Sequence, residues 1–290
     1  MPDATIEDRW ARWLLERRHG GDEAALAEAL RFLEPVRDRV LDDAAIEPGD
    51  TVLDAGCGDG LIGFGALRRV GPEGHVIFSD ISQELLDRCR EIAAGDDRCS
   101  FVAASVTDLA AIESSSVDAV TVRSVLIYVA DRGAAFSELQ RVLRPGGRLS
   151  VFEPLNSFAY PGPSNTWGPW SIEPVQELAD RVKGVFLSIH AGEGSTMHDF
   201  VAEDVVAWAE GAAFRQVALT ASYEVIPATA RAWEDVERRA ANPLVPTLGE
   251  AIEMALDPDE ATRFRAHLRA KVESGDGVER SAHVHLRAVR

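Results

Sequence analysis

A glycine-rich turn between an apolar strand and a helix carries the strongest chemical signal in this chain. The turn reads Asp54-Ala55-Gly56-Cys57-Gly58-Asp59-Gly60 and follows the apolar pair Val52-Leu53. Glycines adopt positive φ easily and let a ligand approach the main chain closely. Open α/β folds bind ligands at the carboxyl ends of their strands. The turn is therefore predicted to be a binding loop, with the Asp54 carboxylate facing the crevice at the sheet edge.

The acidic residues of the turn distinguish between two classes of ligand. The dinucleotide fingerprint Gly-x-Gly-x-x-Gly/Ala needs a small residue where this chain has Leu61. Asp54 and Asp59 would also disfavour a bound pyrophosphate. A ligand with positive charge and no phosphate fits better. S-adenosylmethionine (SAM), with its sulfonium and its α-ammonium group, is such a ligand.

A second acidic residue, Asp80, ends the next apolar segment, 20 positions after Gly60. A carboxylate at this place can accept hydrogen bonds from both hydroxyls of a ribose. A glycine-rich turn by itself also occurs as an ordinary tight loop, and a single aspartate at a strand end as a cap. The two features together, at this spacing, favour a cofactor site over either structural explanation.

The elements that must position these residues alternate between short apolar strands and helices from residue 51 onward. Apolar strands with helical connections predict a mostly parallel sheet that is covered on both faces. The strands are expected at Thr51–Asp54, His75–Ser79, Phe101–Ala104, Val117–Val122 and Arg148–Phe152. The helices between them are expected at Leu61–Val70, Gln83–Ala93 and Arg132–Leu143.

The rest of the chain surrounds this core. A helical stretch precedes it, interrupted by His19-Gly20-Gly21-Asp22 and kinked or broken at Pro35. Residues 155–171 predict a long loop, followed by helices near 174–189 and 201–211 and a strand near 215–226. Several helices are expected in 228–274. Ser281–Arg290 alternates between apolar and polar residues, as an antiparallel edge strand does.

Composition restricts the partners. The 290 residues include 48 acidic and 30 basic side chains, a net charge of −18, which disfavours binding to nucleic acids and to anionic membranes. The three cysteines have no CxxC spacing and no His/Asp cluster has metal-ligand spacing, so we expect no metal and no disulfide framework. The first 18 residues lack an apolar signal segment, so a cytoplasmic location is expected.

The motifs resemble those of the class I, Rossmann-like SAM-dependent methyltransferases, over residues 45–154. The glycine-rich turn is similar to the first motif of that family and Asp80 to its ribose-binding acid. Ser116–Ser124 resembles the fourth-strand motif, and Leu143–Leu149 is similar to the turn before the fifth strand. The resemblance implies a doubly wound, seven-stranded sheet with the last strand antiparallel. It also implies SAM as cofactor, with S-adenosylhomocysteine (SAH) as product.

The resemblance implies one integrated domain in four segments. These are an N-terminal helical lid (1–48), the SAM-binding core (49–154), substrate-side loops and helices (155–214), and closing strands with a helical insertion (215–290). The cofactor-binding residues that it implies are Asp54, Gly56, Cys57, Gly58, Gly60, Asp80, Ile81, Ser105, Val106, Arg123 and Ser124. Ser105 stands where the family often has an aspartate, and Asp108 is nearby.

The segments outside the core exceed what a cofactor needs and imply an enclosed pocket for a small molecule, as in quinone biosynthesis or natural-product tailoring. The acceptor is expected to be an aromatic or heterocyclic metabolite, methylated on oxygen, nitrogen or carbon by in-line displacement. The catalytic candidates are Tyr128, Glu153 and His198. The substrate-binding candidates are Tyr128, Glu153, Asn156, Tyr160, Trp167 and Trp170.

Each of these side chains also has a structural alternative. Tyr128 could be a packed aromatic, Glu153 could cap a loop, and Tyr160, Trp167 and Trp170 could anchor their loop. Two other functions stay open at this point, a nicotinamide-dependent oxidoreductase and a non-catalytic SAM-binding protein. The lid segments could also pack between two copies of the chain in a homodimer.

Overall fold

The computed structural model describes residues 8–18, 23–160, 162–193 and 196–290. The chain divides into two compact units. The sheet unit consists of residues 29–155, 199–222 and 283–290, and the helical unit of the described parts of 1–28, 156–198 and 223–282. The four-segment division expected from the sequence stays a prediction.

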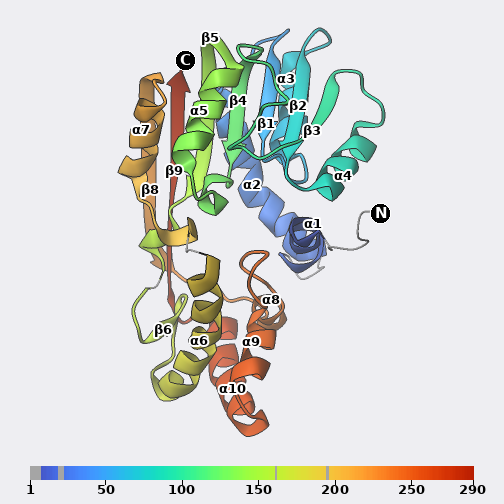
Figure 1. The fold of residues 1–290 in the computed structure, drawn as a ribbon. Coiled ribbons are helices and arrows are strands. Elements are labelled where there is room, and N and C mark those ends of the chain that lie inside the picture. Colours follow the sequence, from blue (N-terminus) through green and yellow to red (C-terminus); the bar gives the residue numbers. More distant parts are fainter. Residues whose placement is uncertain (1–7, 19–22, 161, 194–195) are drawn as a thin grey trace. The chain divides into compact units, whose positions relative to one another are not determined.

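Seven strands form one sheet in the order β3-β2-β1-β4-β5-β9-β8, which can be followed in Figure 1. Neighbours among β1 to β5 pair in parallel, and β9 pairs antiparallel to β5. The seven-stranded, Rossmann-like sheet with its antiparallel last strand is thereby confirmed. The strands are β1 (Thr51–Ala55), β2 (His75–Asp80), β3 (Cys99–Ala103), β4 (Val117–Arg123), β5 (Leu143–Pro154), β8 (Arg215–Pro227) and β9 (Val278–Val289).

Helices cover both faces of this sheet. One core cluster joins α2, α3 and α4 to strand residues that include Phe78 and Phe152. Elsewhere, α5 and α7 pack together, with the Phe136 and Trp208 ring centroids 6.2 Å apart. The helices are α2 (Glu23–Asp43), α3 (Leu61–Val70), α4 (Gln83–Ala93), α5 (Arg132–Val142) and α7 (Ala202–Gly211). Among the described residues, no helix combines the length and the apolar character needed to cross a membrane.

One expectation from the sequence is wrong and another is narrowed. The alternating C-terminal segment is not an edge strand, because β9 lies between β5 and β8. Its polar face is in part covered, since His285 is only 5% exposed and its ring lies 5.0 Å from that of Phe152. Of the two outcomes expected at Pro35, a kink or a break, the structure excludes the break, because α2 runs through this residue. The expected break at residues 19–22 lies outside the described residues.

The helical unit has its own hydrophobic core. Helix α1 (Arg9–Arg12) continues into a π-helical turn, Trp13–Arg17, and a two-stranded hairpin, β6 (Thr166–Trp167) with β7 (Trp170–Ser171), interrupts the expected long loop. Asp257 caps α10, as anticipated, by accepting bonds from the N–H groups of Asp259 and Glu260. The remaining helices are α6 (Gln176–Glu193), α8 (Trp233–Glu237), α9 (Leu248–Ala255) and α10 (Pro258–Ser274).

Helix α3 approaches the sheet closely because it has glycine at position 63. A Cβ atom added to Gly63 would lie 2.3 Å from Cε1 of Phe78, a fully buried side chain. The Phe78 ring is itself stacked on Phe101, with 5.3 Å between the centroids. The ring has little room to move, so this glycine determines how close the helix can lie to β2.

We predict that Gly63→Ala destabilises the protein. Alanine is normally preferred to glycine inside a helix by about 0.5–1 kcal/mol, but overpacking a core costs about 1–3 kcal/mol. Gly184→Ala in α6 is the matched control, because an added Cβ there meets nothing within 4 Å. Urea unfolding should give a lower free energy of unfolding for Gly63→Ala and an equal or higher one for Gly184→Ala. A similar change in both variants would contradict the steric explanation.

Candidate functional site

The glycine-rich turn after β1 is held against the ends of β2 and β4. The N–H groups of Gly56 and Cys57 both donate to the carbonyl oxygen of Ser79, at 2.7 and 2.9 Å. Gly56 has a φ of +72°, and an added Cβ would lie 2.3 Å from Cγ2 of Val125. Only glycine combines this backbone conformation with so close a neighbour. The turn is therefore a fixed feature of the sheet edge.

The carboxylate of Asp54 stabilises this turn by accepting two hydrogen bonds inside the protein. Its Oδ1 accepts the Thr121 hydroxyl at 3.0 Å, and its Oδ2 accepts the Gly63 N–H at 2.8 Å. The side chain is 1% exposed, and burial raises its pKa to about 7. The expectation that this carboxylate faces an open crevice is wrong, because both of its oxygens are bonded inside the protein. A role for Asp54 in cofactor binding stays a prediction.

Asp80 connects the glycine-rich turn to the loop after β2. Its Oδ2 accepts the Gly58 N–H and its Oδ1 accepts the Ser82 N–H, both at 2.9 Å. A carboxylate has about four acceptor positions and can therefore accept from several donors at once. The next residue, Ile81, is 56% exposed, which is unusual for a large apolar side chain. An acid and an apolar surface thus lie together at the end of β2.

Cys57 is a packed residue and not a reactive one. It is 5% exposed, and the thiols of both Cys57 and Cys89 lie within hydrogen-bonding distance of the Gly58 carbonyl oxygen. The contact with Cys89 and the burial raise the pKa of the Cys57 thiol well above its ordinary value. A protonated, buried thiol is a poor nucleophile. Any cofactor contact from this residue would come from its backbone.

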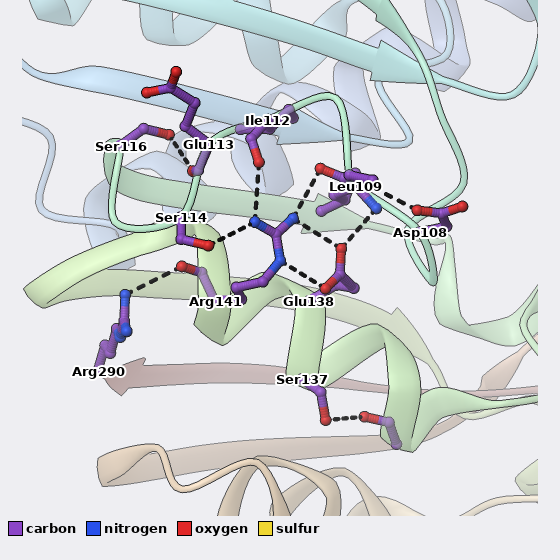
Figure 2. Close-up of polar contacts among 12 residues, drawn as sticks. Asp108, Leu109, Ile112, Glu113, Ser114, Ser116, Ser137, Glu138, Arg141 and Arg290 are labelled. Carbon is purple, nitrogen blue, oxygen red and sulfur yellow. Dashed lines mark hydrogen bonds and ion pairs between the residues drawn. The ribbon is translucent and has the colours of Figure 1, made fainter.

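The loop after β3, which carries Ser105 and Val106, is fixed from α5. Figure 2 shows the Arg141 guanidinium donating to the carbonyl oxygens of Leu109 and Ile112, at 2.8 and 3.0 Å, while Glu138 accepts the Leu109 N–H at 2.8 Å. The Ser105 hydroxyl is 2.8 Å from that of Thr107. Val106 is 6% exposed. The loop that is predicted to meet the cofactor is therefore held by hydrogen bonds from its backbone to the ion pair of Arg141 and Glu138.

The turn after β4 is held by the buried carboxylate of Glu153. Its Oε1 accepts the N–H groups of Val125 and Leu126, at 2.8 and 2.9 Å, and its Oε2 accepts that of Ile127 at 3.3 Å. Glu153 is fully buried, and burial raises its pKa to about 7 although these bonds oppose the shift. This geometry matches the loop-capping alternative for Glu153. Its assignment as a catalytic or substrate-binding group stays a prediction without support from these contacts.

Residues 123–128 run along the edge between these buried acids. Arg123 ends β4, and its charge lowers the pKa of both Asp54 and Glu153. Ser124 has a φ of +56°, a conformation that residues other than glycine rarely adopt and that is often found at functional sites. Tyr128 ends the 3₁₀ turn that Glu153 caps. The turn and the Glu153 carboxylate that caps it together fix the backbone position of Tyr128.

Arg132, which the sequence reasoning missed, holds the same turn from α5. Its Nε donates to the Leu126 carbonyl oxygen at 3.0 Å, and its Nη2 bonds to Asp199 at 2.7 Å. The guanidinium lies over the rings of Phe200 and Trp208, 4.8 and 5.1 Å from their centroids. This arginine is 7% exposed. The only local signal was its place after the helix cap Asp131, which cannot reveal a partner 67 residues away.

The remaining predicted residues belong to the helical unit. The rings of Tyr160 and His198 lie together with their centroids 4.3 Å apart, so two candidates distant in sequence are neighbours. Trp167 packs against Phe186 and Phe264, and Trp170 is 5% exposed in the same core. These two tryptophans therefore anchor their segment. Asn156 opens the 3₁₀ turn Asn156–Phe158, where its carbonyl oxygen accepts the Tyr160 N–H.

In the part of the chain that the structure describes, no group of three or more His, Cys, Asp or Glu side chains is arranged so that it could hold a metal ion. The polar side chains that converge in the sheet unit instead bind backbone groups. These bonds fix the loops around two residues at the end of β2, the carboxylate of Asp80 and the exposed apolar side chain of Ile81.

Glu153 makes stability depend on pH in a defined direction. Its pKa is raised from 4.5 to about 7, so the folded state binds more protons than the unfolded state between these values. We predict that the melting temperature of the wild type falls as pH rises from 4.5 to about 7, and that Glu153→Gln falls less over the same interval. Asp54→Asn is the companion variant, because Asp54 titrates in the same range. Parallel curves for wild type and Glu153→Gln would rule out this titration.

Comparison with known proteins supports the interpretation of the sheet unit. Residues 46–177 match the family described as methyltransferase domain. An arsenite methyltransferase of Halobacterium salinarum is 35% identical over 41% of this chain and 30% of its own length. The nocamycin O-methyltransferase of Saccharothrix syringae is 32% identical over 52% of this chain and 51% of its own length. The chain thus spans between about a third and about half of the length of these curated relatives.

Solved structures agree on the fold. The structure of a geranyl diphosphate methyltransferase in complex with SAM superposes over 93% of this chain and 91% of its own, with a TM-score of 0.53 and 21% sequence identity. At that identity the likeness concerns the fold alone. Together with the strand order, the turn after β1 and the acid at the end of β2, the family match leads to one conclusion: residues 46–177 of this chain are similar to a methyltransferase domain and lie on a Rossmann-like sheet.

Proposed function

We propose that the protein transfers a methyl group from SAM to a small-molecule acceptor. The observation that carries this proposal is the hydrogen bond from the Gly58 N–H to Asp80, which joins the glycine-rich turn to the acid at the end of β2. The family match gives the nicotinamide-dependent alternative no support, and Leu61 argues against it from the sequence.

The residues at the end of β2 fit the adenosine part of SAM. The Asp80 carboxylate, at the carboxyl end of β2, stands where an acid can accept the two ribose hydroxyls. The exposed side chain of Ile81 offers an apolar surface to a flat purine base. Ser105 and Val106, on the loop that Arg141 fixes, would meet the base from the next strand. The glycine-rich turn would receive the methionine part.

The size class of the acceptor follows from the relatives. The matched proteins act, by their names, on arsenite, on nocamycin and on demethylmenaquinone, the last being the substrate named for an enzyme of Clavibacter sepedonicus that is 39% identical over 40% of this chain. All three are small molecules. We extend this class to the present chain and favour an aromatic or heterocyclic acceptor.

The protein's task in such a reaction is alignment and exclusion of water. When bound, SAM supplies a methyl group on a sulfonium, and the transfer yields SAH. Orientation of two reactants can contribute about 7–11 kcal/mol to a barrier reduction. The turn that carries Tyr128 is suited to this task, because Glu153 and Arg132 fix its backbone from two sides. Tyr128 is our leading candidate for orienting the acceptor, and His198, beside Tyr160, our candidate base.

The activity is tested by incubating the protein with SAM and a panel of acceptors that contains a quinol, hydroxylated aromatics and arsenite. We expect SAH to form only when a suitable acceptor is present, together with a product that has gained one methyl group, both measured by mass spectrometry. Binding of SAH without turnover on any acceptor would favour a non-catalytic SAM-binding protein. Thermal stabilisation by NAD but not by SAH would refute the choice of cofactor.

We predict that Asp80→Ala weakens SAH binding about tenfold or more in calorimetry, because hydrogen bonds to a charged group contribute about 1.5–3 kcal/mol. Asp80→Asn separates charge from shape, since it keeps one acceptor for the loop N–H groups. Asp97→Asn on the exposed surface is the control for net charge. Unchanged affinity in Asp80→Ala, with an unchanged melting temperature, would remove the ribose assignment.

A further inference from the structure

The helical unit contains a small cavity that the proposed methyl transfer does not use. It has a volume of about 90 Å³ and is lined by Arg9, Arg12, Trp13, Arg17, Asn242 and Pro243. All six residues belong to the helical unit. The cavity therefore forms within one unit, from its N-terminal helix and the loop before α9.

Local contacts fix the walls of this cavity. Asp8 caps α1 by accepting the N–H groups of Trp10 and Ala11, at 3.0 and 3.1 Å. The Trp13 indole N–H donates to the Ala240 carbonyl oxygen at 2.8 Å, and the Ala240 N–H donates to the Arg17 carbonyl oxygen at 3.3 Å. The helix is thus docked on the loop through side-chain and backbone bonds, and the arginines are presented from a fixed backbone.

The opposite wall is equally ordered. Asn242 is 2% exposed, and its Oδ1 accepts the Leu244 N–H at 2.8 Å. An asparagine side chain that accepts through its oxygen still carries an amide group with two N–H donors. Asn242 therefore adds N–H donors to the lining of the cavity and carries no charge.

The charge of the lining is opposite to that of the chain. Among the described residues, three arginines and no Asp or Glu line the cavity, in a protein whose net charge is −18. Arg17 is ion-paired with Glu250, and Arg12 lies 3.9 Å from Glu16. Arg9 has no carboxylate within ion-pair distance among the described residues. The positive charge of the lining attracts an anionic ligand.

We propose that this cavity binds an oxyanion group, a phosphate or a carboxylate, of a small molecule. The planar guanidinium group matches both oxyanions because it offers two parallel N–H donors. Arg9 and Arg12 are one helical turn apart, so both reach the same side of α1. Trp13, which follows Arg12, also lines the cavity and is held by its bond to the Ala240 carbonyl oxygen. This assignment does not rest on the proposed methyl transfer, because it is tested by measuring anion binding and not enzymatic activity.

The test uses isothermal titration of the full-length protein with inorganic pyrophosphate and, separately, with citrate, at one fixed ionic strength. We expect saturable binding of at least one anion to the wild type, and a loss of affinity of about tenfold or more in Arg9→Gln/Arg12→Gln, since charge-assisted bonds are about twice as strong as neutral ones. Tighter binding of pyrophosphate assigns the site to phosphates, and tighter binding of citrate assigns it to carboxylates.

Two controls make the result decisive. Arg88→Gln/Arg215→Gln removes the same charge from exposed positions of the sheet unit and should keep the wild-type affinity. SAH binding and the melting temperature should be unchanged in both double variants, so a failure here is distinguishable from a failure of the proposed function. The proposal is overturned if neither anion binds, or if both double variants lose affinity to the same extent.

Discussion

Three carboxylates near the carboxyl ends of β1, β2 and β5 hold the functional edge of the sheet together by accepting backbone N–H groups. Asp54 in β1 binds the first turn of α3, Asp80 at the end of β2 binds the glycine-rich turn, and Glu153 in β5 binds the turn that ends at Tyr128. Buried N–H groups left without acceptors are costly, so each carboxylate fixes a loop that would otherwise need water. A binding site between such loops is rigid before any ligand arrives.

Burying these acids in their charged form costs free energy, and the nearby charge of Arg123 reduces that cost. Desolvation raises the pKa of Asp54 and Glu153 to about 7, and Arg123 opposes the shift at both. Arginines serve the loops in a second way, because Arg132 and Arg141 bind carbonyl oxygens that carboxylates cannot. Acids satisfy the donors of the loops and arginines satisfy their acceptors. The net charge of −18 therefore does not reveal that acidic and basic side chains have different structural roles in these loops.

Much of the sheet unit could be predicted because its signals are local. The apolar strands, the helices Leu61–Val70 and Gln83–Ala93, and the caps at Asp131 and Asp257 follow from residues that lie next to one another in the chain. The orientation of Asp54 could not, because it depends on Thr121, 67 residues away. The position of β9 inside the sheet could not be predicted for the same reason. Alternation of apolar and polar residues indicates that one face of a strand is covered, but it does not indicate which strands lie beside it.

The sequence by itself determined the class of this protein, because a glycine-rich turn and an acid after the next strand are short-range patterns that a ligand requires. The tertiary structure decided what each polar side chain does. It turned Asp54 and Glu153 inward as acceptors for backbone N–H groups, brought Tyr160 beside His198, and gathered three arginines around one cavity. These outcomes depend on contacts between distant segments, and only packing, which removes polar groups from water and demands partners for them, selects those contacts.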